Sequence, residues 1–130
     1  MALEPIISLG SEQSGAERTR ITTDGQSFGV HEWRGSGPGY LHVHHADDEA
    51  WHVLEGTVRF RFADREVEAG PGSTVFVPAG VPHDYSADRT CRYLIILTPR
   101  LRALIDELQR TPDFKQHGAV MQRYESEILE

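Results

Sequence analysis

Short apolar runs separated by turn residues dominate the first hundred residues of the chain. In the run 57–62, Val58, Phe60 and Phe62 alternate with polar or charged neighbours, which is the two-residue period of a strand with one buried face. Gly, Pro, Asp and Ser residues between the runs indicate turns. We therefore expect strands over residues 27–33, 40–44, 49–54, 57–62, 73–77, 83–86 and 91–98. Many short strands at close spacing predict an all-β sandwich or barrel.

After Pro99 the pattern changes to the spacing of amphipathic helices. Leu101, Leu104 and Leu108 recur at helical intervals, and a proline is well tolerated in the first turn of a helix. A Thr-Pro-Asp break then separates this helix from a second amphipathic run that extends to Ile128. A lid or a subunit contact is the weaker alternative to packing of these helices on the barrel. The expected segments are an N-terminal arm or edge strand over 1–26, a barrel over 27–98, and barrel-packed helices over 99–130.

Length and charge narrow the class of protein. A chain of 130 residues can bury about two thirds of its unfolded surface, which is enough for one core. The net charge of −7 and the lack of a basic stripe argue against nucleic-acid binding, and no apolar run approaches the roughly 18 residues of a membrane span. The N-terminus lacks the features of a secretory signal, so we expect a cytoplasmic protein. The lone Cys91 excludes an internal disulfide and is expected to be buried.

Four polar side chains stand out against the strand pattern. His42 and His44 lie two residues apart on a predicted strand, so their side chains point to the same face. Glu49 begins the next extended run and can return beside them, and His83 follows a turn that reverses the chain. Three imidazoles and one carboxylate suit a borderline transition metal and leave coordination positions free. His45, His52 and His117 are interpreted as surface or structural residues. His31 could line the barrel, and we interpret it as structural rather than as a ligand.

These residues belong to two longer motifs that resemble those of the cupin superfamily. The first motif, H-x-H, four residues, E, six residues, G, is met by His42, His44, Glu49 and Gly56. The second motif, G-x5-P-x-G-x2-H, is met by Gly72, Pro78, Gly80 and His83. Two positions depart from the family pattern, because Ser36 stands where an opening glycine is expected and Ala87 replaces a closing asparagine. Neither position carries a ligand, although the departures bear on the local turn geometry.

The resemblance implies a cupin double-stranded β-helix, a jelly-roll barrel, similar to the small single-domain microbial cupins of the quercetin dioxygenase type. It also implies one divalent transition metal, Fe, Ni, Mn or Zn, with His42, His44, Glu49 and His83 as its ligands. Iron, nickel or manganese would suit a dioxygenase that acts on a small oxygen-rich molecule, whereas zinc would suit a non-oxidative isomerase, cyclase or lyase. A non-catalytic, small-molecule-binding cupin is the alternative to an enzyme.

Strand phase supplies candidates for the rest of the site. Glu49 and Tyr85 are the candidate catalytic residues. Tyr85 lies two residues after His83 and therefore on the same face of the strand. Its phenol can donate a hydrogen bond to an oxygen at the metal, or simply to a backbone partner. The run 93–97 is apolar on both faces. Because dimers are also common among cupins, this pattern predicts a homodimer that buries the outer face. The candidate pocket residues, any of which could instead be ordinary core, are Trp51, Val53, Phe60, Phe76, Tyr85 and Tyr93.

Overall fold

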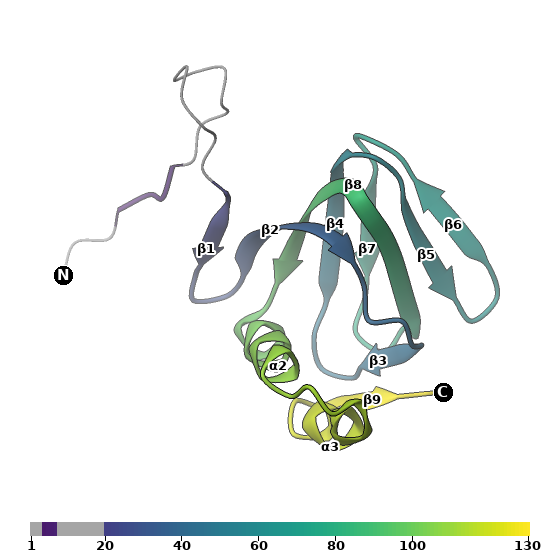
Figure 1. Cartoon of the computed structure of the whole chain (residues 1–130). Helices are drawn as coiled ribbons and strands as arrows, with labels where there is room; N and C mark the ends of the chain where they lie inside the picture. The colour runs from purple at the N-terminus through teal and green to yellow at the C-terminus, as the bar shows by residue number, and fades with distance from the viewer. Residues whose placement is uncertain (1–3, 8–19) are drawn as a thin grey trace.

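The computed structural model describes residues 4–7 and 20–130, and strands form the largest part of the described chain (Figure 1). The strands are β1 (Thr22–Asp24), β2 (Gly29–Ser36), β3 (His42–His44), β4 (Glu49–Glu55), β5 (Val58–Phe62), β6 (Glu66–Ala69), β7 (Thr74–Val77), β8 (His83–Leu97) and β9 (Ser126–Ile128). The helices are α2 (Pro99–Gln109), the short 3-10 helix η1 (Phe114–Gln116) and α3 (His117–Gln122). All the strand pairings are antiparallel, and the expected all-β class is confirmed.

Strand β8 joins the two halves of the barrel. Its second half pairs with β2 and β4, whereas its first residues, His83 to Ser86, pair with β3 and β5. The sequence predicted two strands here, 83–86 and 91–98, and the structure instead has one strand of 15 residues. Both pairings of the second half shift in register, between Arg34 and Ser36 of β2 and between Val53 and Glu55 of β4. Because such irregularities bend a strand, β8 passes from one half of the barrel to the other without a break.

The core lies between the two halves of the barrel and continues beneath α2. Trp51, Val53 and Phe60 have no exposed surface, and Leu101 and Leu104 of α2 close the same apolar cluster. The Thr98 hydroxyl accepts a hydrogen bond from the Leu101 amide and so caps α2. Cys91 is buried as expected, and its thiol donates to the Thr57 carbonyl. Among the described residues, no helix combines the length and apolar character that crossing a membrane requires.

The C-terminal segment differs from the predicted pair of helices. Helix α3 ends at Gln122, and Ser126 to Ile128 form β9, which pairs with β3 so that His42 lies opposite Ile128 and His44 opposite Ser126. The helical spacing of 120–128 was therefore misleading beyond Gln122. The short strand β3 has an open edge on this side, and β9 satisfies its backbone groups. The unpaired backbone groups of β3 belong to a distant part of the chain, so the local sequence pattern of 126–128 does not indicate this pairing.

Two further expectations concern the N-terminal arm and a homodimer through the outer face of the barrel. The described end of the predicted arm contains an edge strand, because β1 pairs only with β2; residues 1–3 and 8–19 of the arm lie outside the described residues. On the outer face, Val30, Ile96, Ala50 and Phe76 are cross-strand neighbours on β2, β8, β4 and β7. A homodimer through this apolar row stays a prediction. Sedimentation at micromolar concentration tests it, with a dimer expected for the wild type and a monomer for Phe76→Asp.

Candidate metal centre

The structure brings together the four side chains that the sequence singled out. His42 and His44 project from β3 to one side, and His83 begins β8 directly opposite His42. One potential ligand nitrogen from each of these three imidazoles lies within 4.8 Å of the others. Glu49, the first residue of β4, places its Oε1 atom 3.3 Å from His44 Nε2 and 3.2 Å from His83 Nε2. All four residues are buried, so the site is inside the barrel.

Hydrogen bonds to the backbone determine which nitrogen of two imidazoles carries the proton. The Nδ1 atom of His42 lies 3.1 Å from the Tyr40 carbonyl, and that of His83 lies 2.9 Å from the Val81 carbonyl. Because a carbonyl oxygen can only accept, each Nδ1 must be the donor. In the neutral rings of His42 and His83, the Nε2 atoms are therefore unprotonated and carry the free lone pair.

The third imidazole, that of His44, has the same tautomer, which is set by a side chain rather than by a backbone carbonyl. Nδ1 of His44 lies 2.7 Å from the Ser126 hydroxyl, which itself donates to the Tyr124 carbonyl at 3.1 Å. Since the single hydroxyl proton of Ser126 is used on Tyr124, its oxygen must accept from Nδ1–H of His44. Outer partners of this kind set the tautomer and orientation of metal-binding histidines. All three histidines thus direct an Nε2 lone pair into one buried space.

This arrangement requires a positive charge at its centre. Nε2 lone pairs of His44 and His83 face the carboxylate of Glu49 at 3.2 to 3.3 Å, and two acceptors repel unless a proton or a cation lies between them. Two ligands bound at about 2.0 to 2.2 Å to one ion, with an angle between them near 90° to 109°, are about 2.8 to 3.6 Å apart. The separations of Glu49 Oε1 from His44 Nε2 and His83 Nε2 match that range, and the three imidazoles lie close enough to share an ion, so the donor set fits a transition metal.

The pKa values of His42 and Glu49 agree with a centre that binds a metal ion and in which His42 does not bind a proton. Burial, with help from the neighbouring His83 and His44, lowers the pKa of His42 to about 3. Burial alone would raise the pKa of Glu49. When the Nε2 atoms of His44 and His83 carry protons, their hydrogen bonds and charges outweigh burial and lower the pKa of Glu49 to about 2. At neutral pH the site therefore presents an unprotonated imidazole and an ionised carboxylate, the forms that coordinate metals.

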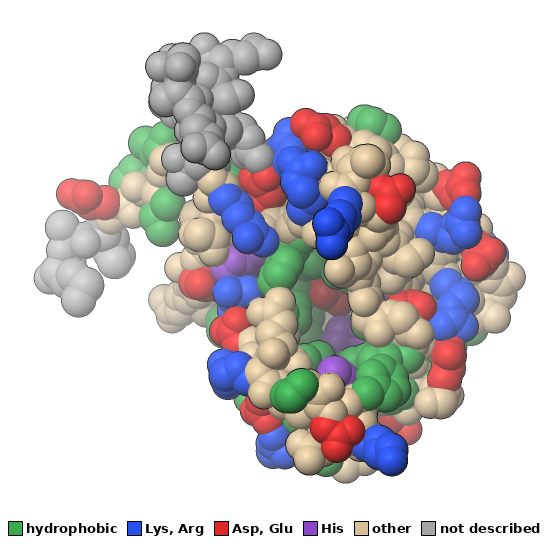
Figure 2. Space-filling view, viewed as in Figure 1, with side chains coloured by type: hydrophobic (Ala, Val, Ile, Leu, Met, Phe, Trp, Pro, Cys, Tyr) green, Lys and Arg blue, Asp and Glu red, His purple; other side chains and the backbone are tan. Residues whose placement is uncertain are grey.

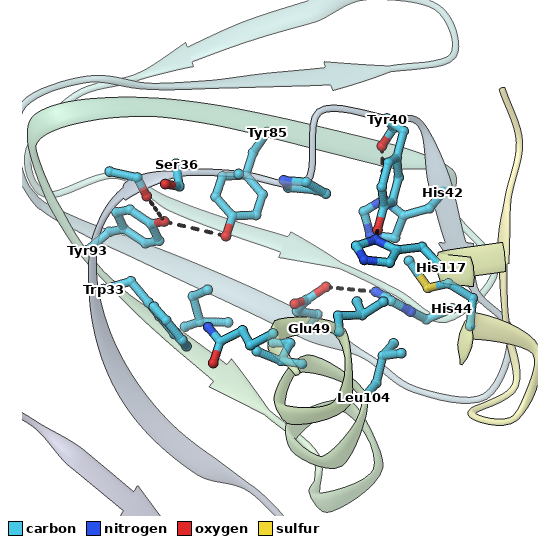
Figure 3. A pocket seen from close by; sticks show the side chains of 18 of the residues that line it. Trp33, Ser36, Tyr40, His42, His44, Glu49, Tyr85, Tyr93, Leu104 and His117 are labelled. Carbon is cyan, nitrogen blue, oxygen red and sulfur yellow. Dashed lines mark hydrogen bonds and ion pairs between the residues drawn. The ribbon is translucent and has the colours of Figure 1, made fainter. Parts of the chain in front are cut away.

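A cavity of about 550 Å³ opens onto this centre. Figure 2 shows the hollow, with histidine atoms at its floor and apolar side chains around it. His42, His44 and Glu49 contribute to one end of its wall, and Figure 3 shows them beside residues from the C-terminal helices. The apolar and aromatic lining includes Trp33, Tyr40, Ile95, Leu104, Leu108 and Met121. A cavity of this size can hold a small organic molecule next to the four donors.

Comparison with known proteins agrees with the motifs. The family model for the cupin domain matches residues 29–97. The chain belongs to the cupin family. Among solved structures, the chain is similar to a cupin protein from Bacteroides fragilis (16% identity, 75% of this chain and 86% of that one, TM-score 0.56) and to protein NMB1881 from Neisseria meningitidis (21%, 72% and 99%, TM-score 0.55). KdgF from Halomonas sp. is also similar (18%, 62% and 77%, TM-score 0.53). At these identities the likeness shows the fold alone, and a comparison with curated proteins found no match.

Tyr85 and Tyr93 line the cavity of this cupin, as the strand phase indicated. The Tyr93 hydroxyl lies 2.7 Å from the Gly35 carbonyl and 3.4 Å from the Tyr85 hydroxyl. Because Tyr93 must donate its one proton to Gly35, the proton of Tyr85 meets, among the described residues, only a distant acceptor in Tyr93. Burial raises the pKa of Tyr85 well above its usual value and that of Tyr93 to about 12. Tyr85 therefore stays protonated at neutral pH and can donate into the cavity.

Four other predicted pocket residues lie elsewhere in this cupin. Trp51, Val53 and Phe60 belong to the hydrophobic core and are not part of the cavity wall, although the Trp51 ring packs edge-on against His83 at 5.6 Å. The placement of Phe76 was wrong, because this side chain is 60% exposed. On β7 it is Val77, opposite Glu49, that turns inward, so the alternation predicted for this strand was shifted by one residue.

Three of the four remaining histidines have structural or surface positions, as expected. His31 is buried between the Thr22 hydroxyl at 3.0 Å and the Asp24 carboxylate at 2.8 Å. His45 is largely exposed, and His52 hydrogen-bonds Thr74 on the sheet surface.

His117 is the functional candidate that the sequence reasoning missed, because it lines the cavity. Its spacing gave a usable signal: His117 lies one helical turn before the buried Met121 and so shares the inward face of α3.

Proposed function

We propose that this cupin is a metal-dependent enzyme that acts on a small organic molecule with neighbouring oxygen donors. The observation that carries the proposal is the preset orientation of the three imidazoles. His42, His44 and His83 each have Nδ1 occupied by a hydrogen bond and Nε2 directed into one buried space beside Glu49. A ligand set arranged in advance at the end of a cavity favours a centre that receives a substrate over one with a purely structural ion.

The residues divide into holding and reacting groups. His42, His44, His83 and Glu49 would hold Fe, Ni, Mn or Zn, which supplies Lewis-acid activation of a substrate oxygen or, when redox-active, chemistry with dioxygen. Tyr85 donates a hydrogen bond to a substrate oxygen, because its proton has no close acceptor among the residues that the structure describes. Side chains such as Ile95 and Leu104 exclude water from the substrate's other faces.

Two reaction classes fit this assembly. A dioxygenase of the quercetin dioxygenase type is the class that the motifs resemble, and it requires a redox-active metal. A non-oxidative isomerase, cyclase or lyase is the second candidate, and the protonated Tyr85 beside the donor set supports it, since such reactions depend on proton transfer between positions of the substrate. A cupin that only binds its ligand would hold the same molecule without turnover.

Metal analysis of untagged protein tests the centre. We expect close to one transition metal per chain in the wild type and none in His42→Ala or His83→Ala. Asp48→Ala is the matched control, because Asp48 neighbours Glu49 in sequence but is exposed and accepts a hydrogen bond from the Ala79 amide. Loss of metal from Asp48→Ala as complete as from Glu49→Ala would refute the ligand assignment.

Reaction class is tested on the reconstituted protein. Dioxygen uptake by the iron-loaded form is measured across flavonols, diketones and catechols, and turnover of the same compounds is followed with the zinc-loaded form. Uptake with iron supports the dioxygenase. Turnover by the zinc form without uptake by the iron form supports the non-oxidative class, and metal binding without turnover of any compound supports a binding role.

A further inference from the structure

His117 occupies the cavity wall with one nitrogen free to accept a proton. Its Nε2 atom lies 2.7 Å from the Thr111 carbonyl, which can only accept, so Nε2 carries the hydrogen. In the neutral ring the lone pair is then on Nδ1, which lies 3.5 Å from the Tyr40 hydroxyl. This is the reverse of the three histidines of the metal centre, where Nδ1 carries the hydrogen and Nε2 is free.

The environment of His117 separates it from the metal centre. It does not belong to the group of three histidines whose ligand atoms converge. The Tyr40 ring is in edge-on contact with both His117 and His42, and Figure 3 shows the three side chains near one another. Phe114 packs against the His117 ring with its centroid 5.3 Å away. Within the described part of the chain, no carboxylate forms an ion pair with His117. An imidazole with its Nε2 edge held by the Thr111 carbonyl is thus placed on the wall of the candidate substrate cavity.

The contact between Nδ1 and Tyr40 is long enough to be exchanged for a contact with a substrate. At 3.5 Å it lies at the outer limit of a hydrogen bond, whereas the 2.7 Å bond to Thr111 holds the opposite edge of the ring firmly. A substrate C–H or O–H group in the cavity can therefore replace the phenol without turning the imidazole. Tyr40 also lines the cavity and acts as a positioning residue for Nδ1 of His117.

We infer that His117 is a general base that takes a proton from an enolisable hydroxy-carbonyl substrate bound in the cavity. In this step a C–H bond next to the carbonyl breaks, an N–H bond forms at Nδ1, and the bonding electron pair stays on the substrate. Return of the proton from Nδ1 to the former carbonyl carbon, while the hydroxyl proton passes to the former carbonyl oxygen, completes an isomerisation with no net oxidation. The inference rests on the proposed enzymatic function and selects its non-oxidative class, and a positioned base of this kind contributes about 10²- to 10⁴-fold to a rate.

The first test measures the tautomer and needs no turnover. Long-range ¹H–¹⁵N NMR spectra of metal-free and zinc-loaded protein are recorded, and the His117 signals are identified by their loss in His117→Gln. We expect hydrogen on Nε2 and a bare Nδ1 in both forms. A ring with hydrogen on Nδ1 would overturn the assignment, because it would have no lone pair to offer on the cavity side.

The second test measures proton transfer with acetoin, whose hydroxyl and carbonyl oxygens are adjacent, as the probe. Exchange of its carbinol hydrogen in D₂O is followed by ¹H NMR with zinc-loaded wild type, His117→Gln and the control His52→Gln. The glutamine amide can still donate to Thr111 but is not a base, so we expect exchange to fall at least about 100-fold with zinc content unchanged. His52 bonds Thr74 outside the cavity, and its variant should exchange like the wild type.

The outcomes separate this inference from the function on which it rests. Zinc-loaded wild type that exchanges no faster than zinc-free protein, or His117→Gln that exchanges as fast as wild type, overturns the role of His117 while leaving the metal centre intact. Protein that binds no metal overturns the proposed function, and the tautomer measurement still decides whether His117 offers a free Nδ1.

Discussion

Replacing Ser126 with alanine is the sharpest test of how the metal centre is held together. Of the three partners that orient the imidazoles, two are the main-chain carbonyls of Tyr40 and Val81, which no substitution removes. Only the partner of His44 is a side chain, the Ser126 hydroxyl at 2.7 Å. Ser126→Ala therefore deletes one orienting contact and leaves all four predicted ligands in place.

The expected magnitude follows from the hydrogen bonds that are lost. The variant leaves Nδ1–H of His44 buried without an acceptor, which costs about 1 to 3 kcal/mol when the donor cannot reach water. The ring can escape this cost by turning over, but its lone pair then points away from Glu49 and His83. Loss of an outer partner typically lowers metal affinity about 10- to 100-fold, which corresponds to about 1.4 to 2.8 kcal/mol.

The assay is competition for zinc between metal-free protein and a chromophoric chelator. We expect Ser126→Ala to bind one zinc ion per chain with an affinity lowered by the stated factor. Ser86→Ala is the matched control, because Ser86 is exposed on β8 and far from β9 in sequence. An affinity for Ser126→Ala within twofold of the wild type would refute the argument that the His44 tautomer is set by Ser126.

Three further predictions concern stability, each measured by urea denaturation of metal-free protein. Ser36 has a left-handed φ of 66°, so Ser36→Gly should raise the free energy of unfolding by about 0.5 to 1 kcal/mol. Tyr93→Phe should lower it by about 1 to 3 kcal/mol, because the buried Gly35 carbonyl loses its donor. The pKa of His42 is lowered from 6.5 to about 3, so the unfolded chain takes up a proton that the folded chain refuses as the pH falls through this window. His42 should therefore cost about 2 kcal/mol of stability between pH 7 and pH 5, and His42→Gln should lack this loss.

The part of the site that the sequence predicts well depends on rules that act over a few residues. His42 and His44 face the same way because strand side chains alternate, and the two motifs place Glu49 and His83 at strand starts. The structure has these four side chains together. Alternation also explains the error at Phe76, because on a strand of four residues between turns a shift of one position exchanges the inner and outer faces.

The residues of the candidate site that the sequence does not predict lie in the C-terminal tail, residues 99–130. Nothing in the local pattern of 126–128 indicates a strand, because β9 exists only to pair with the edge of β3, more than 80 residues earlier. The sequence predicts only part of the placement of His117: its spacing from Met121 assigns it to the inward face of α3, but only the packing of α3 shows that this face reaches the cavity. Long-range pairing of this kind overrides local periodicity.

The tail is therefore part of the site rather than an addition to a finished barrel. The cupin domain match ends at residue 97, yet Leu104 of α2 closes the cavity, His117 of α3 lines it, and Ser126 of β9 holds the ring of His44. The four predicted ligands all lie within the matched region, so a barrel without the tail would keep the donors but lose the orientation of one of them and much of the cavity wall. The proposed metal centre thus depends on the barrel motifs, whereas the proposed proton transfer and much of the wall of the candidate substrate cavity depend on residues 99–130.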